Sequence, residues 1–507
     1  MVSIDKAAIV FGRNVMNLGD ANSTEIDAKT KNPIVDLLPG SSITEVYTTA
    51  DLDYFGAIAN AQALRDKALT SLVAQIDTQG PGSAIVVFNT LSWDRIGLVE
   101  VETILPKGRF HVVNSDGQVI LSQKTHDGKL LVEATVPAFG HAVFFVVAGF
   151  KAGGDSGRLA ASRTMLENKF LSIKFDNHGR FVSIYDLVHK REVLPKGERG
   201  NVLQFFEDRP HLHDAWDIDH NFYKEKKWEP CAAHKIQLLE EGPLRAIVRF
   251  HRRNRKSVFV EDLVMDAVQH RVDVHLQVDW HEKRTLLKVA FPVEILATRA
   301  TFDIQWATIE RTTHDSTEFD RARFEVPAHY WADLSEGDYG VSLLNDCKYG
   351  YDVRGNTLRL SLLRSSIDPD PHADEGRHNM KYALYPHKGD WRCGSVKQGY
   401  EFNNELLAVA TQSHSGAKAT LTAFLKVDRD NIIVETLKKA EDSQAVVVRV
   451  YEAHGQRNSA TFTFSRKPKR IFEIDMMEDN PKIVNFKARE MDLFFLPYEI
   501  KTLRVEF

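Results

Sequence analysis

The sequence predicts a mainly β protein, built of antiparallel β-sandwich domains that follow a short α-helical segment. From residue 79 onward, short runs of alternating apolar and polar residues succeed one another without helical periodicity between them. Before that point, apolar residues recur at helical spacing. The 507 residues suffice for about three domains and a large core.

Residues 44–77 are predicted to form a helix. Apolar residues recur there every three or four positions, at Leu52, Phe55, Ile58, Leu69, Leu72, Val73 and Ile76. Such a stripe requires other helices to bury it, so we expect part of this face to lack partners within the chain. Pro81 and the glycines beside it end the pattern, and the first strand follows.

The clearest strand lies at residues 271–280. Val272, Val274, Leu276, Val278 and Trp280 fall on one face, and polar residues occupy every position between them. This alternation is typical of an antiparallel strand with one buried face. Residues 358–362 and 446–450 repeat it.

The predicted organisation has five segments. Residues 1–31 are irregular and 32–78 are helical. A small β domain spans 79–155 and ends in a Gly-rich stretch, a large sandwich spans 156–425, and a small β domain spans 426–507.

Composition excludes several classes of protein. A formal net charge of −5 gives no electrostatic reason to bind nucleic acid or an anionic membrane. No apolar run is long enough for a secretory signal or a membrane helix, and three scattered cysteines form no disulfide framework. We therefore expect a soluble, cytoplasmic protein, or a vacuolar one without a classical signal peptide.

Two segments, 207–223 and 368–391, are rich in acids, histidines and aromatics and do not alternate, so both are predicted to be long loops. Asp214, Trp216 and Asp217 offer carboxylates that can bridge sugar hydroxyls beside a flat ring that can stack on a sugar. The alternative is that Trp216 plugs the core and the acids cap backbone N–H groups.

The same segments contain possible metal ligands. His211, His213 and Asp214, with Asp217, Asp219 and His220 nearby, have residue types that bind zinc. The second segment contains a similar set, Asp368, Asp370, His372, Asp374 and His378. Loop histidines are common without a metal, so neither set is a specific signal.

Several strings, in the same order along the chain, resemble glycoside hydrolase family 38. They include GSAIVVFNTLSWDR at 82–95, GRFVSIYDLVHKREVL at 179–194, WHEKRTLLKVAFPV at 280–293 and ADEGRHNMKYALYPHKG at 373–389. The resemblance covers residues 32–507 and is nearest to the cytosolic and vacuolar α-mannosidases. It implies a large sandwich of the galactose-mutarotase-like kind, preceded by a remnant of the family's helical middle domain.

The resemblance also implies retaining, metal-dependent hydrolysis of terminal α-D-mannosides, with zinc or cobalt held mainly by an N-terminal barrel. The match to the family's last metal-ligand stretch is Asn32–Ser42, where Val35 replaces the ligand histidine and Asp36 is retained. We therefore expect no catalytic nucleophile and no metal ligand in this chain. The resemblance assigns sugar binding to Asp36, Asp214, Trp216, Asp217 and Arg364; a strand-end salt bridge is the alternative for Arg364.

Two hypotheses follow from the sequence. One is the C-terminal half of an α-mannosidase, inactive alone, whose partners are α-mannoside glycans and an N-terminal catalytic barrel or further copies of itself. The other is a non-catalytic sugar-binding or partner-binding β-sandwich protein of the same ancestry. A metal at His211, His213 and Asp214 would offer a third route to activity.

Overall fold

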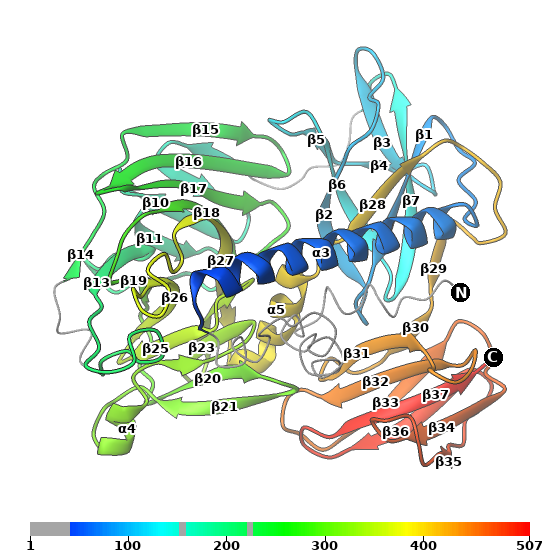
Figure 1. Cartoon of the computed structure of the whole chain (residues 1–507). Helices are drawn as coiled ribbons and strands as arrows, with labels where there is room; N and C mark the ends of the chain where they lie inside the picture. Colours follow the sequence, from blue (N-terminus) through cyan, green and yellow to red (C-terminus); the bar gives the residue numbers. More distant parts are fainter. Residues whose placement is uncertain (1–40, 152–158, 221–226) are drawn as a thin grey trace.

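A computed structural model describes residues 41–151, 159–220 and 227–507. It confirms the predicted fold class: the sheets are antiparallel and one long helix, α3 (Thr44–Val73), precedes them (Figure 1). Three shorter helical elements follow, α4 (Glu318–Ala322), η4 (Trp391–Cys393) and α5 (Ser395–Asn403). None of the described helices is long and apolar enough to cross a lipid bilayer.

Helix α3 spans most of the predicted range and has buried residues toward both ends, Val46 and Ala50 near its start and Val73 at its end, while residues 51–60 between them are exposed. Leu69, Leu72 and Val73 pack on the first sheet, whereas Leu52 and Phe55 are 70% and 69% exposed. The predicted apolar stripe is thus present, and its N-terminal part is uncovered by the described residues.

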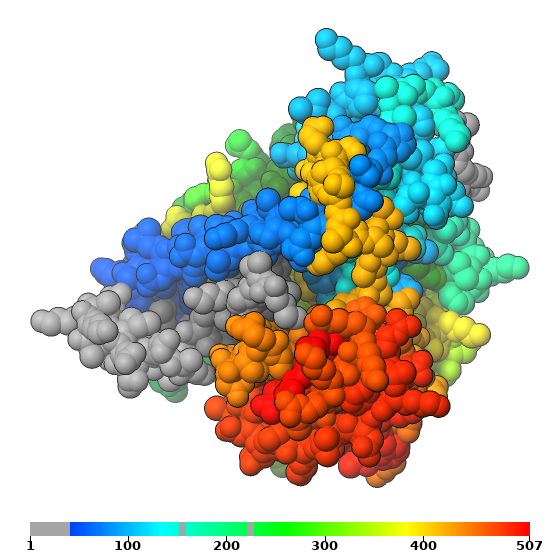
Figure 2. All heavy atoms as spheres, turned by 90° about the vertical axis from the view of Figure 1, so that its right-hand side faces the viewer, coloured from blue at the N-terminus to red at the C-terminus, as the bar shows by residue number. Residues whose placement is uncertain are grey.

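The first β unit contains two sheets around one core. The three-stranded sheet is β2 (Arg95–Val101), β6 (Leu130–Val136) and β5 (Ser122–Lys124). The larger sheet is β28 (Leu407–Thr411), β1 (Ser83–Asn89), β7 (Gly140–Ala148), β3 (Phe110–Asn114) and β4 (Val119–Ile120), with β29 (Leu421–Ala423) beside β7. Residues 407–423 therefore return to a sheet begun far earlier, and Figure 2 shows them on the surface of this unit.

The large sandwich buries one continuous core. Its nine-stranded sheet is β15 (Lys235–Glu241), β16 (Arg245–Asn254), β17 (Ser257–Asp266), β18 (Val272–Trp280), β27 (Gly376–Lys388), β24 (Tyr339–Asn345), β23 (Trp331–Ser335), β20 (Arg299–Ile304) and β21 (Ala307–Thr312). The six-stranded sheet is β14 (Lys227–Trp228), β13 (Val202–Glu207), β19 (Thr285–Pro292), β26 (Thr357–Ser365), β25 (Gly350–Arg354) and β22 (Val326–Pro327). A five-stranded sheet completes it, with β12 (Arg191–Glu192), β11 (Phe181–Asp186), β10 (Leu171–Phe175), β9 (Met165–Glu167) and β8 (Ala160–Ser162).

The predicted strand at 271–280 is confirmed as β18, with its apolar face buried as expected. The prediction of a loop over all of 368–391 is wrong, because residues 376–388 form β27 between β18 and β24. Tyr382 to His387 are buried on both faces of this central strand, so their sequence shows no alternation. The remaining acidic part, 368–375, is a loop.

The C-terminal unit packs two sheets on one core. The five-stranded sheet is β31 (Ile432–Lys439), β32 (Val446–Glu452), β37 (Ile500–Glu506), β34 (Arg470–Ile474) and β35 (Lys482–Ile483). The three-stranded sheet is β30 (Leu425–Val427), β33 (Asn458–Phe464) and β36 (Glu490–Phe495). The exact boundaries between the five predicted segments stay predictions.

Candidate functional site

The loop that contains Asp214, Trp216 and Asp217 packs on the outer face of the six-stranded sheet. Along β13 and β19, Phe205 and Leu287 point into the core, while their neighbours Phe206 and Leu286 face outward. Ile218 packs on this outward apolar pair. Ile218 therefore gives the loop 208–220 an apolar contact with the sheet.

Arg364, near the end of β26, holds the same loop by its guanidinium group. Nε donates to Asp208 Oδ2 at 2.7 Å, and the Nη atoms donate to the carbonyls of Asp214 (2.7 Å), Ala215 (2.9 Å) and Asp217. Burial raises the pKa of the Asp208 carboxyl, and the Arg364 charge opposes that rise. Arg364 thus makes a strand-end ion pair and also fixes the backbone of the predicted sugar-facing residues.

The Asp214 side chain ties this loop to the next one. Its Oδ2 accepts from the backbone N–H groups of Ile367 (2.6 Å) and Asp368 (3.2 Å), and its Oδ1 lies 3.9 Å from the Arg284 guanidinium. The carboxylate therefore caps backbone groups, as the alternative interpretation of the sequence expects. Asp217, in contrast, is exposed.

Trp216 does not plug the core, because it is 61% exposed. Its ring stacks on the His213 ring, with centroids 5.6 Å apart and planes at 28°, and its indole N–H donates to Ser41 Oγ. His213 has φ 57°, a left-handed conformation that turns the chain, and its carbonyl accepts from Trp216 and Asp217. An aromatic ring is thus held in one orientation and left open to solvent.

A third segment, the start of α3, completes the cluster. Thr44 Oγ1 donates to the buried Asp370 at 2.5 Å, and Ser42 N–H donates to the Tyr47 hydroxyl at 2.9 Å. Burial raises the pKa of Tyr47, and the carboxylates of Asp370 and Asp374 add to the rise. Residues 41–47, 213–217 and 364–374 are therefore brought together, and Ser41 belongs to the Asn32–Ser42 stretch. Val35 and Asp36 lie outside the described residues.

The predicted zinc-binding set of His211, His213 and Asp214 is not brought together, because its members have different partners. His211 and His220 lie 3.6 and 3.5 Å from Asp219, while His213 is stacked on Trp216. Among the residues that the structure describes, one group of three has its ligand atoms within 4.8 Å of one another, and it is elsewhere: Asp186, His189 and His270. The sequence analysis missed this group, whose only local signal is the spacing of Asp186 and His189 across a turn.

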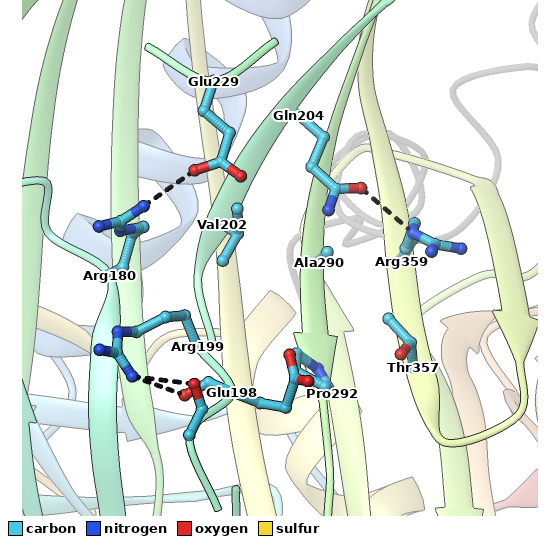
Figure 3. A pocket seen from close by; sticks show the side chains of 11 residues that line it. Arg180, Glu198, Arg199, Val202, Gln204, Glu229, Ala290, Pro292, Thr357 and Arg359 are labelled. Atoms are coloured by element: carbon cyan, nitrogen blue, oxygen red, sulfur yellow. Dashed lines mark hydrogen bonds and ion pairs between the residues drawn. The ribbon is translucent and has the colours of Figure 1, made fainter. Parts of the chain in front are cut away.

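A polar cavity of about 320 Å³ lies on the same outer face, at the opposite end of the strands (Figure 3). Arg180 donates to Glu229 (2.9 Å), Arg359 to Gln204 (3.2 Å), and Arg199 to backbone carbonyls. No aromatic side chain lines it. The guanidinium groups of Arg180 and Arg359 already have side-chain partners, and the cavity offers no ring on which a sugar could stack.

Between this cavity and the loop lies a buried ion-pair network. The Lys288 ammonium is fully buried and pairs with Glu325 and Asp352, and Arg359 Nη1 donates to Asp352 at 2.7 Å. Burial acts to raise the pKa of Asp352, but Lys288 and Arg359 outweigh it, so the pKa lies below its usual value. This network occupies the middle of the face with structural contacts.

Comparison with known proteins decides the family. The sequence model described as "Glycosyl hydrolases family 38 C-terminal domain" matches residues 166–372, and that of the family's C-terminal β-sandwich domain matches 431–503. "Alpha-mannosidase 2C1" of Homo sapiens is 33% identical over 484 residues, which cover 93% of this chain. The chain belongs to glycoside hydrolase family 38.

A second relative agrees with this assignment, and a solved structure shares the fold. "Alpha-mannosidase G" of Dictyostelium discoideum is 37% identical over 357 residues, 68% of this chain. An α-mannosidase from Enterococcus faecalis V583 has the same fold, with a TM-score of 0.76 over the whole chain at 17% identity, and this chain covers 66% of it. The family 38 chain spans 44% of the human relative and 33% of the Dictyostelium one.

Proposed function

We propose that this family 38 chain forms the β-sandwich half of a cytoplasmic, retaining, metal-dependent α-mannosidase and supplies part of its sugar-binding surface. The support is the match to proteins named α-mannosidases along nearly the whole chain. One structural observation supports placing the sugar-binding surface at Trp216. Its ring is exposed, yet His213 and Ser41 fix the orientation of that ring. A preorganised ring needs little further ordering when it stacks on a sugar.

Within the proposed site the five residues have different roles. Trp216 supplies the stacking face, and Asp217 and Asp36 supply carboxylates for sugar hydroxyls. Asp214 and Arg364 are positioning residues, because their polar atoms already bond the loop backbone and Asp208. Loss of Arg364 is therefore expected to weaken sugar binding indirectly, through movement of Trp216 and Asp217.

We propose that the nucleophile and the metal ligands come from polypeptide outside the described residues. A retaining glycosidase needs two carboxyl groups about 5–5.5 Å apart, one of them free to attack carbon. In the cluster described above, Asp208 is paired with Arg364, Asp214 caps two backbone N–H groups, and Asp370 accepts from Thr44 and His372. These three carboxylates are committed to structural hydrogen bonds, so no chemical step is assigned to them.

Sugar binding is tested by titrating the full chain with methyl α-mannoside and α-mannobiose, followed by calorimetry and saturation-transfer NMR. We expect Trp216→Ala to abolish the binding measured for the wild type. Phe319→Ala is the matched control, because Phe319 on α4 is also exposed, at 79%, and lies outside the cluster. Binding that survives Trp216→Ala, or that falls equally in both variants, would refute the assigned surface.

Catalysis is tested separately with a chromogenic α-mannoside in the presence of zinc or cobalt. The 507-residue chain alone is expected to release no more product than buffer. Turnover at the rate of an intact α-mannosidase would contradict the proposed division of labour between this chain and the catalytic carboxylates.

The second candidate function, partner binding without catalysis, is favoured by the exposed apolar residues of α3. Leu52, Phe55 and Ile58 lie on it uncovered. A catalytic barrel or a second copy of the chain would bury them, and such area is rarely left open on a monomer. Sedimentation velocity distinguishes the two: a concentration-dependent dimer that Leu52→Ser with Phe55→Ser dissociates indicates self-association.

A further inference from the structure

A buried carboxylate and two imidazoles meet at one end of the large sandwich. Asp186 ends β11 and is fully buried. Its Oδ1 accepts from the backbone N–H groups of Val188 and His189, both at 2.9 Å, which folds the turn back on the carboxylate. As a result His189 Nδ1 lies 2.9 Å from Asp186 Oδ2. His270, from the turn between β17 and β18, places its Nε2 3.2 Å from the same oxygen.

The orientation of His270 is more informative than its distance. Its Nε2 is buried and has no hydrogen-bond partner among the described residues, although Asp186 Oδ2 lies 3.2 Å away. The contact is therefore short enough for a hydrogen bond but lies outside hydrogen-bond angles. The two imidazole planes lie at 12° to each other with centroids 5.8 Å apart. The two rings are therefore nearly parallel, and each has one nitrogen within 3.2 Å of Asp186 Oδ2.

The separations match those of ligands around one ion. The three ligand atoms all lie within 4.8 Å of one another. Zinc binds histidine nitrogen and carboxylate oxygen at about 2.0–2.2 Å, so neighbouring ligand atoms of a tetrahedral site lie roughly 3–3.5 Å apart. The distances of 2.9 and 3.2 Å from Oδ2 to the two nitrogens lie near that range, and the two nitrogens lie within 4.8 Å of each other.

The surroundings hold the carboxylate by a hydrogen bond and one imidazole by ring stacking. The Tyr339 hydroxyl donates to Asp186 Oδ2 at 2.9 Å, and Phe170 stacks on His270 with ring centroids 5.3 Å apart. The position of the Asp186 carboxylate is fixed by the backbone N–H groups of Val188 and His189 and by the Tyr339 hydroxyl, as hydrogen bonds fix metal ligands in other proteins.

We propose that Asp186, His189 and His270 bind one divalent transition-metal ion, preferably zinc, with water as the fourth ligand. The ion joins the turn after β11 to the turn between β17 and β18. None of its ligands belongs to the cluster of Asp214, Trp216 and Arg364, so the site is separate from the proposed sugar-binding surface. It also departs from the sequence-based expectation that this chain has no metal ligand.

The test uses the full chain, stripped with a chelator and titrated with Zn²⁺ by calorimetry and with Co²⁺ by visible absorption. We expect one ion per chain and the intense d–d bands of four-coordinate cobalt. His189→Ala and His270→Ala should each weaken binding by more than the roughly 10–100-fold typical of losing an outer contact, and Tyr339→Phe by about that amount. X-ray absorption of the wild type should show two imidazoles and light-atom ligands at about 2.0–2.2 Å.

Two controls separate this site from other histidines. His251→Ala removes a strand histidine bonded to Gln237, and His281→Ala disrupts the exposed cluster with Glu375. Both variants should bind one ion with unchanged affinity. Binding lost in His281→Ala but retained in His270→Ala would overturn the proposal. So would binding of no ion by a wild-type chain whose circular dichroism and melting temperature show that it is folded.

Discussion

Replacing Arg364 by alanine would test whether the ion pair between Arg364 and the buried Asp208 holds the loop 208–220 in place. Asp208 is 3% exposed, and Arg364 is bonded to both of its carboxylate oxygens. Removing one partner of a buried pair leaves an uncompensated charge and costs about 3–5 kcal/mol. The carbonyls of Asp214, Ala215 and Asp217 also lose a donor, but solvent can replace it at the exposed edge.

The effect should be measured globally and locally. Urea unfolding followed by far-UV circular dichroism gives the free-energy change, and amide exchange at Ile367 and Asp368 reports the loop itself, because Asp214 accepts from both. The local measurement is needed because a chain with several separate cores need not unfold in one step. Both amides should exchange faster in the variant.

The pH dependence has a defined sign. The folded-state pKa of Asp208 is raised above its unfolded value, so the folded state binds the proton more tightly. The cost of the buried charge is therefore present above the raised pKa and is relieved as the pH falls through it. Loss of the Arg364 charge raises that pKa further, so the deficit of Arg364→Ala should shrink as the pH is lowered from 7 toward the ordinary carboxyl range.

Two comparisons decide the result. Asp208→Asn in the Arg364→Ala background should recover part of the loss, because it replaces the stranded charge with an amide. Arg299→Ala, which breaks the exposed pair with Glu310, should cost only about 0–1 kcal/mol. A loss below about 1 kcal/mol for Arg364→Ala, or no rescue by Asp208→Asn, would refute the reasoning.

Three further outcomes are expected. Lys288→Met removes the cation paired with Glu325 and leaves Asp352 with Arg359 alone, and it should lower the free energy of unfolding by about 3–5 kcal/mol in urea titrations, unlike Lys426→Met at an exposed pair. Trp280→Ala, which removes a fully buried ring, should cost about 3–5 kcal/mol and lower the melting temperature, whereas a stable variant would mean that the core had collapsed into the space. Hydrogen bonds from His372, His281 and Lys283 lower the pKa of Glu375 to about 2. The stabilising contribution of Glu375 should therefore be present above the ordinary carboxyl pKa and be lost completely only when the pH has fallen to about 2. A carbon NMR titration in which Glu375 titrated near 4 would contradict this.

The sequence predicted the strands in which buried and exposed residues alternate. It missed the strands in which successive residues are equally buried. Strand β18 alternates because its polar positions face away from the core. Strand β27 lies in the middle of the same sheet and is buried on both faces along its second half, which removes the alternation. The short strands β28 and β29 are only partly buried, so no local pattern marks their return to the first sheet.

The loop containing Asp214, Trp216 and Asp217 was also predictable, because its residue types differ so much from those of the strands around it. The division of labour within it was not. Asp214 caps the backbone N–H groups of Ile367 and Asp368, which lie 153 and 154 residues away in sequence, and only the folded chain shows this contact. For the same reason the sequence could not associate His270 with Asp186 and His189, which come from a different turn of the sandwich.

The pairing of β1 with β28 has a consequence for synthesis on the ribosome. Phe88 lies opposite Leu407, and Asp77 N–H donates to the carbonyl of Lys418, so the first unit cannot close until the whole large sandwich has been translated. Until then one edge of β1 is unpaired and open to wrong partners. A nascent chain stalled before residue 407 should therefore engage chaperones or be digested by protease within its first β unit, and one released after residue 423 should resist both.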